Sequence, residues 1–190
     1  PPLVLLHSGH VYPTERNPNV FLQTLAQLKA SHRLDKNQLK IIFRGIDPQH
    51  YLNQYIKELS LDDIVELKPS VAHEEAIHEI LNAHGLIILQ ADNCNHQIPA
   101  KAYEYLRANK PILALTDHQG DTANLLRPFD HCYIANLMNS DEIEEKLIRL
   151  IDDIQNQTYH QTSLTSITPL SRQCRTEALA SLLDQLTQTS

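Results

Sequence analysis

Short apolar segments alternate with longer amphipathic segments along almost the whole chain, and this alternation constrains the fold more than any other feature of the sequence. Most of the apolar segments are apolar on both faces, which is typical of strands in a sheet that helices cover on both sides. The alternation predicts an α/β fold, a doubly wound parallel sheet of about six strands flanked by helices. The expected strands cover residues 3–9, 39–45, 63–68, 85–90, 111–116 and 131–136.

The helical segments carry signals for where they begin and end. Asn17 is expected as the N-cap of the first helix, with Pro18 at its first helical position. The helix that starts at His73 has two glutamates in its first turn, and Gly85 is expected just past its end. The polar composition of residues 155–170 predicts a loop.

No internal repeat or shift in composition divides the chain. Residues 1–190 are therefore expected to form a single domain, with a closing helix over about 171–188. The chain begins with two prolines and no initiator Met, which predicts a linker or domain boundary at this point. No apolar run reaches the roughly 18 residues of a membrane span, and no signal-peptide pattern is present. Three widely spaced cysteines favour reduced thiols, and these features together predict a cytoplasmic protein.

The charge of the chain limits its partners. A formal net charge of −7 argues against a protein that binds duplex nucleic acid, because such proteins carry a basic stripe. A site for one small anion is still compatible with this charge, since it needs only a few local cations.

Ligands of an open parallel sheet bind at the carboxyl ends of its strands. Gly9 and Arg16 lie in the loop after the first strand, and the loop after the fourth strand leads to Pro99 and Lys101. Pro99 is expected in the first turn of a helix, where free N–H groups attract an anion and Lys101 adds a positive charge. Glu104 follows one turn later, and its carboxylate can accept two hydrogen bonds from a cis-diol such as ribose. These residues predict a site for a nucleoside diphosphate.

Simpler interpretations of the same residues stay open. Lys101 and Glu104 could form a solvated pair on a helix surface, Gly9 could serve only a turn, and Arg16 could be merely exposed. Neither the G-x-G-x-x-G fingerprint nor a P-loop is present. The segment "HEEAIH" is one residue too long for a zincin motif, because histidines at i and i+5 lie about 140° apart on a helix and cannot share a metal.

The stretch "IPAKAYEYLRANKPILAL" (98–115) resembles the "iPgKlfEYlatgkPiLal" signature of the bacterial group 1 (family 4) glycosyltransferases. The stretch "LLHSGHVYPTERNPNVFLQTLAQL" is similar to the phosphate loop and first helix of the same family's C-terminal domain. The remaining segments follow in the family's order over nearly the whole chain. The resemblance implies the Rossmann-like C-terminal half of a GT-B fold, which binds a nucleotide-sugar donor.

The resemblance also implies roles for individual residues. Glu104 would bind the ribose hydroxyls of the donor. Lys101, Arg16 and the amides near Gly9 would hold the diphosphate and stabilise the charge that develops as the sugar leaves, which makes Lys101 and Arg16 the expected catalytic residues. The other expected contacts are the backbone of Ser70 and Val71 around the base, and Ile98, Pro99 and Ala100 at the donor sugar or its phosphate.

Two places in the chain depart from the family pattern. Many relatives have a second glutamate eight positions before the ribose-binding glutamate, where it contacts the donor sugar, and this chain has His96 there. His96 is therefore the position on which the identity of the sugar depends. A basic residue common in many relatives is also displaced by one place, since this chain has Glu15 followed by Arg16.

The resemblance makes this chain the donor-binding half of a glycosyltransferase that retains the configuration of the sugar. The expected donor is a UDP-, GDP- or ADP-sugar, with no metal and no cofactor. The acceptor-binding N-terminal domain is expected to be a separate half, without which the chain is inactive in transfer and through which any membrane association would occur. Two alternatives stay open: the corresponding half of a GT-B nucleotide-sugar epimerase, and a non-catalytic α/β binding module.

Overall fold

The computed structural model describes residues 1–12, 14–47 and 50–188. Six strands form one sheet in the order β3-β2-β1-β4-β5-β6, and every neighbouring pair is parallel. The chain reverses its direction of progress across the sheet between β1 and β4, so the crevice for a ligand is expected at the carboxyl ends of these two strands. The strands are β1 (Leu3–Ser8), β2 (Leu39–Arg44), β3 (Val65–Lys68), β4 (Gly85–Leu89), β5 (Ile112–Leu115) and β6 (Cys132–Ala135).

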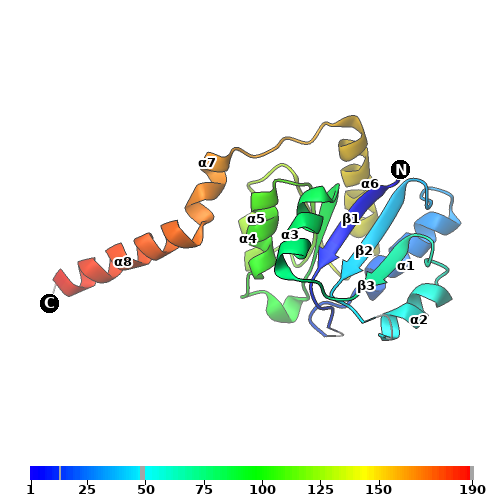
Figure 1. The fold of residues 1–190 in the computed structure, drawn as a ribbon, viewed down its shortest axis with the longest axis horizontal. Helices are drawn as coiled ribbons and strands as arrows, with labels where there is room; N and C mark the ends of the chain where they lie inside the picture. Colours follow the sequence, from blue (N-terminus) through cyan, green and yellow to red (C-terminus); the bar gives the residue numbers. More distant parts are fainter. Residues whose placement is uncertain (13, 48–49, 189–190) are drawn as a thin grey trace.

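Helices cover both faces of the sheet, as the sequence predicts (Figure 1). Consecutive strand residues point to opposite faces, so Leu5 joins one hydrophobic core and Leu6 joins the other. The first core holds the buried sides of α1 (Asn19–Ala30), α2 (Tyr51–Glu58) and α6 (Ser140–Asn156). The second holds those of α3 (His73–Asn82), α4 (Ala100–Ala108) and α5 (Asp121–Leu126).

The first helix starts later than the sequence analysis expects. Pro18, not Asn17, is the N-cap of α1, and its carbonyl accepts a hydrogen bond from the Leu22 N–H at 2.8 Å. Asn17 still satisfies a donor of the first turn, because its Oδ1 accepts from the Asn19 N–H at 2.9 Å. The expected boundary is therefore wrong, although the polar side chain serves the helix end.

Gly85 does not end a helix, contrary to the expectation. The helix α3 ends at Asn82, and Gly85 opens β4. A Cβ atom at this position would lie 2.7 Å from Leu5 Cδ2, so the glycine permits a close approach between β4 and β1. The sequence signal was real, but its physical cause is packing within the sheet.

The C-terminal region departs most from the expectation. The segment 155–170, predicted as a loop, holds the end of α6, the short helix α7 (Leu164–Ile167) and the 3₁₀ turn η2 (Thr168–Leu170). Helix α8 (Arg172–Gln188) lies where the last helix was expected, but it projects away from the α/β body instead of closing onto it (Figure 1). Its four leucines are each more than half exposed: Leu179, Leu182, Leu183 and Leu186.

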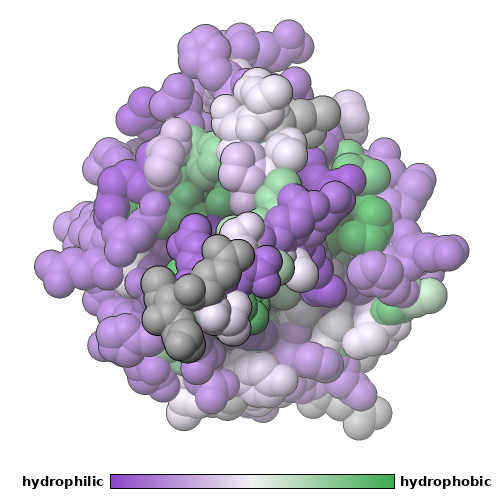
Figure 2. Space-filling model, turned by 90° about the vertical axis from the view of Figure 1, so that its left-hand side faces the viewer, coloured by the Kyte–Doolittle hydropathy of each residue, from purple (hydrophilic) through white to green (hydrophobic). Residues whose placement is uncertain are grey.

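The surface on the side from which α8 projects is mostly hydrophilic, with hydrophobic residues in separate areas (Figure 2). Among the described residues, no helix has both the length and the apolar composition to span a bilayer.

Candidate functional site

Gly9, the residue that follows β1, stands at the centre of the carboxyl edge of the sheet. Its φ of +134° lies in a region that favours glycine, and its N–H donates to the Arg44 carbonyl at 2.8 Å. A Cβ atom here would lie 2.7 Å from Lys101 Nζ. A side chain at this position would therefore be strained by the backbone conformation and would displace the lysine ammonium from the end of β1.

Helix α4 is fixed against this same strand end. Pro99 is its N-cap, with an extended backbone, so it precedes the first turn in which the sequence placed it. The buried hydroxyl of Tyr105 accepts a hydrogen bond from the Ser8 N–H at 3.0 Å, which ties α4 to the last residue of β1. In the described part of the chain, the N–H groups of Ala100 and Lys101 have no recorded acceptor. The start of α4 thus offers free donors beside Gly9.

Lys101 is part-buried, and its Nζ has no hydrogen-bond partner among the described residues. Burial, together with the positive charge of Arg16, lowers the pKa of Lys101 to about 7, while the charge of Glu104 acts in the opposite direction. No ion pair joins Lys101 to Glu104 in the described ranges. The interpretation of these two residues as a solvated surface pair therefore fails for Lys101, whereas Glu104 is exposed.

A neutral histidine, His7, lies within electrostatic reach of Lys101. The fully buried His7 has its Nδ1 3.0 Å from the Ile87 carbonyl, which can only accept, so Nδ1 carries the hydrogen. Its Nε2 is then a buried acceptor with no partner in the part of the chain that the structure describes. Burial and then the charge of Lys101 hold the pKa of His7 well below its usual range. Sequence analysis missed His7, although a histidine within an apolar strand was a visible signal.

Arg16 lies within electrostatic reach of Lys101 and His7. Its guanidinium lies over the ring of Tyr12, 5.5 Å from the ring centre, and Nη1 donates to the His10 carbonyl at 3.3 Å. The charge of Arg16 lowers the pKa of both Lys101 and His7, which places the three groups within electrostatic reach of one another. The structure therefore gathers Gly9, Arg16, Lys101 and Glu104, as the sequence analysis expected.

A cavity of about 490 Å³ adjoins this group. A Cβ atom on Gly45, one of its lining residues, would lie 3.4 Å from the Gly9 carbonyl carbon, so the cavity continues from the Gly9 loop. Ser70 lines the cavity, and its part-buried neighbour Val71 follows in the chain. Sequence analysis missed the other lining residues, although the aromatic Tyr12 between Gly9 and Arg16 was a usable signal. They are His10, Val11, Tyr12, Gly45, Ile46, Asp47, His50 and Pro69.

His96 lies in a loop that hydrogen bonds hold on both sides. The Asn95 carbonyl accepts from the Asp121 N–H at 2.8 Å, and the Gln97 carbonyl accepts from Gln90 Nε2 at 2.7 Å. The His96 side chain itself is exposed. Two further predicted residues differ in burial. Ile98 packs against the second core, whereas Ala100 is exposed at the start of α4.

Arg44 is a cation of this edge that the fold uses for itself. Its side chain is almost fully buried and pairs with Glu79, and its Nη1 donates to the Pro69 carbonyl at 2.9 Å. The hydrogen bonds that the Arg44 guanidinium donates to the Glu79 carboxylate raise the pKa of Arg44. Arg44 therefore connects the end of β2 to α3 and is not available to a ligand as Lys101 is.

Comparisons with known proteins agree with this architecture. A family model described as "Glycosyl transferases group 1" matches residues 2–153. No curated protein matches the chain. Among solved structures, the chain is similar to WaaG, a glycosyltransferase involved in lipopolysaccharide biosynthesis, with a TM-score of 0.61 and 14% identity over 80% of this chain. It is also similar to sucrose-phosphate synthase from Thermosynechococcus elongatus, with a TM-score of 0.66 and 14% identity over 100% of this chain.

The chain spans less than half of either structure. It covers 38% of WaaG and 46% of sucrose-phosphate synthase. At this identity the likeness concerns the fold, which is the Rossmann-like C-terminal half of a GT-B architecture.

Proposed function

The chain belongs to the group 1 glycosyltransferases, and from this membership we propose that it is the donor-binding half of an enzyme that transfers a sugar from a nucleoside diphosphate sugar. One observation carries the proposal. Lys101 holds a part-buried ammonium without a partner in the described chain, next to a glycine and a helix start, at the switch point of the sheet. A diphosphate is the ligand that satisfies all of these donors together.

The donor would lie across the carboxyl edge from Ser70 to Glu104. Its base would occupy the cavity that Tyr12 and Ser70 line, and its diphosphate would lie over Gly9, between Arg16 and Lys101. The exposed carboxylate of Glu104, one helical turn after Lys101, would accept hydrogen bonds from the ribose hydroxyls.

The same cations would assist the reaction itself. When the bond between the sugar C1 and the phosphate oxygen breaks, negative charge increases on the departing diphosphate. Lys101, Arg16 and the N–H groups at the start of α4 would stabilise that charge more strongly than the charge of the intact donor. We propose that this electrostatic stabilisation replaces a divalent metal, and that transfer proceeds with retention at C1.

The acceptor would come from the other half of the enzyme. A GT-B enzyme holds its acceptor on a second, N-terminal domain that faces this edge of the sheet. That domain would exclude water from the cleft, so the chain by itself would bind the donor but transfer poorly. His96, on its fixed loop ahead of α4, would face the donor sugar and contribute to the choice of sugar.

Calorimetric titration of the chain with UDP, GDP, ADP and UMP tests the proposed function. We expect one diphosphate to bind and to bind more tightly than its monophosphate, because the second phosphate adds contacts to Lys101 and Arg16. If no nucleotide binds at millimolar concentration, the donor-binding role is wrong for this chain. If UMP binds as tightly as UDP, the cations do not serve a diphosphate.

A further inference from the structure

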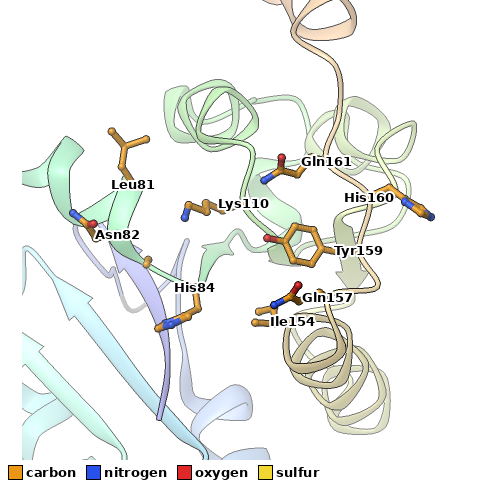
Figure 3. Close-up of a pocket in the computed structure, with 10 residues that line it drawn as sticks. Leu81, Asn82, His84, Lys110, Ile154, Gln157, Tyr159, His160 and Gln161 are labelled. Carbon is orange, nitrogen blue, oxygen red and sulfur yellow. The ribbon is translucent and has the colours of Figure 1, made fainter. Parts of the chain in front are cut away.

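A second cavity, of about 650 Å³, lies at the amino ends of the strands, opposite the proposed donor site. Its walls come from the end of α3, from the turn between α4 and β5, and from the end of α6 with the segment that follows it (Figure 3). A cavity of this size can hold a ligand as large as one or two sugar rings. Its lining residues are Leu81, Asn82, Ala83, His84, Lys110, Ile154, Gln157, Tyr159, His160 and Gln161.

Hydrogen bonds fix the connecting segment 157–162 in place at both of its ends. Near the start, Thr158 Oγ1 donates to Asp153 Oδ1 at 2.6 Å. Near the finish, Asn109 Nδ2 donates to the Thr162 carbonyl and the Thr162 N–H donates to Asn109 Oδ1, both at 2.9 Å. These contacts hold Tyr159 and Gln161 opposite the turn that carries Lys110. The cavity is therefore formed before any ligand arrives.

Several polar side chains of the cavity are free to meet a ligand. Lys110, Tyr159 and Gln161 extend into the same space, and the Tyr159 hydroxyl is directed toward the side on which Lys110 lies (Figure 3). In the described chain, none of these three side chains has a recorded hydrogen-bond or ion-pair partner, and the same holds for Gln157. Each carries a donor, and all but the lysine also carry an acceptor.

The two histidines of the lining play other parts. His84 turns toward β1, where its Nδ1 accepts a hydrogen bond from the Val4 N–H at 3.0 Å (Figure 3). Burial and the charge of Lys110 lower the pKa of His84, which keeps this ring neutral in its structural role. His160 points away from the cavity (Figure 3). Lys110 is thus the one cation among the described residues that enters this space.

The charge around the cavity does not suit a phosphate. Three helices, α3, α4 and α6, end beside it, and the last carbonyls of a helix carry partial negative charge. The positive charge of Lys110 complements these carbonyls, and the described residues that line the cavity include no other lysine or arginine to help bind a dianion. Free amides, a hydroxyl and helix-end carbonyls instead match a ligand whose hydroxyl groups both donate and accept.

From this lining we propose that the amino edge of the sheet carries a second ligand site, which binds a neutral, hydroxyl-rich sugar unit of a glycan. The sugar hydroxyls bond with Lys110, Gln157 and Gln161, and an apolar face of the sugar packs on the Tyr159 ring and on Ile154. The site lies at the edge opposite the proposed donor contacts, so it can hold a glycan while the donor site is filled.

The test is an amide NMR titration of the whole 190-residue chain with maltose, cellobiose, lactose and N,N′-diacetylchitobiose, with inorganic phosphate as a charged comparison. We expect millimolar binding of at least one disaccharide, with shifts centred on the amides of Lys110, Tyr159 and Gln161. The double variant Lys110→Ala/Tyr159→Ala should weaken that binding by about tenfold or more. Lys36→Ala, at an exposed lysine outside the cavity lining, is the matched control and should change nothing.

Three results of the titration with the unchanged chain overturn the proposal. The first is no shift with any of the disaccharides, and the second is a set of shifts around Gly9 and Glu104 instead of the cavity. The third is stronger binding of phosphate than of every sugar, which would make this an anion site. Because Tyr159 is part-buried, the exposed Gln161→Ala is measured in parallel: a folded Gln161→Ala protein that binds the sugar as tightly as the unchanged chain also contradicts the site. Loss of UDP binding does not bear on this result, so the two proposals fail separately.

Discussion

A lysine lies at each end of helix α4, and the two lysines differ in burial and in neighbouring charge. Lys101, in the first turn, is part-buried next to Gly9, repelled by Arg16 and without a partner among the described residues. Lys110, just after the helix end, lies in an open cavity among amides and a tyrosine. Cations are favoured at helix C-termini and disfavoured at N-termini. Burial and the charge of Arg16 therefore destabilise the charge of Lys101, whereas Lys110 follows a helix C-terminus.

This difference indicates what each edge of the sheet is prepared for. At the carboxyl edge, two cations lie beside a helix start, and a bound anion with several charges would relieve the repulsion between them. At the amino edge, the carbonyls at the ends of three helices complement the positive charge of Lys110, so this edge attracts an anion less strongly. We therefore propose that one α/β body carries a diphosphate site at one edge of its sheet and a site for neutral hydroxyl groups at the other.

Replacement of Lys101 by methionine should have the largest effect on the comparison. We expect UDP, GDP or ADP affinity to fall about a hundredfold, since a charge-assisted bond in a part-buried site is lost. The unliganded protein should become more stable by about 1–2 kcal/mol, because an unpaired ammonium leaves the site. Calorimetry and urea unfolding at pH 6 measure the two effects. A variant that is less stable and still binds would mean that Lys101 is structural.

Glu104→Ala should have the next largest effect. Loss of the hydrogen bonds to the ribose should weaken nucleotide binding by about 1–3 kcal/mol and leave stability nearly unchanged, since Glu104 is exposed. Glu58→Ala, at another exposed helix glutamate, serves as the control in the same titrations. Equal nucleotide affinities for the two variants would favour the alternative that the chain is a non-catalytic binding module.

The affinity for a diphosphate should depend on pH through Lys101. Below pH 7 the lysine is already charged in the free protein, so binding takes up no proton there. Above pH 7 the bound phosphate raises the pKa of the lysine and each binding event takes up a proton, so the dissociation constant should rise by up to about tenfold per pH unit. Titrations from pH 7 to 9 measure this slope, since the nucleotide phosphates are already ionised there.

Lys101→Arg provides the control for that slope, because a guanidinium stays charged throughout this range. Its affinity should be nearly independent of pH. An equal slope for the variant and the unchanged chain would assign the titration to another group.

Replacement of Lys110 by alanine should have the smallest effect on nucleotides. We expect UDP, GDP or ADP affinity to change by less than about 0.5 kcal/mol, since Lys110 lies at the other edge of the sheet. The same calorimetric titration measures it. A loss comparable to that of Lys101→Met would show that the two edges do not act separately.

The sequence predicted the sheet well because its strands are marked by local patterns. All six strands appear where apolar runs were read, and the apolar run is most continuous in β4 and β5, which are buried on both faces. Helix α8 shows the limit of the same method. Its leucine pattern predicted the helix but not how the helix packs, because the spacing of leucines does not show which surface they will contact.

The sequence allowed a prediction of the candidate-site residues that belong to a motif, but not of those that depend on contacts in the fold. Gly9, Lys101 and Glu104 followed from their positions after strands and at a helix start. His7 and Tyr105 were missed, because their parts depend on contacts between β1, β4 and α4 that no spacing encodes. The second cavity was beyond sequence reasoning for the same reason, since Asn109 and Thr162 are 53 residues apart in the chain.

The most direct test of the central claim is the pKa of the Lys101 ammonium, measured by NMR of the side chain with and without bound UDP, GDP or ADP. We expect a value near 7 in the free chain, because burial and Arg16 oppose the charge, and a clear rise when the diphosphate binds. A value near the usual 10.4 in the free chain, or one that the nucleotide leaves unchanged, would contradict the claim that this edge is prepared for a diphosphate.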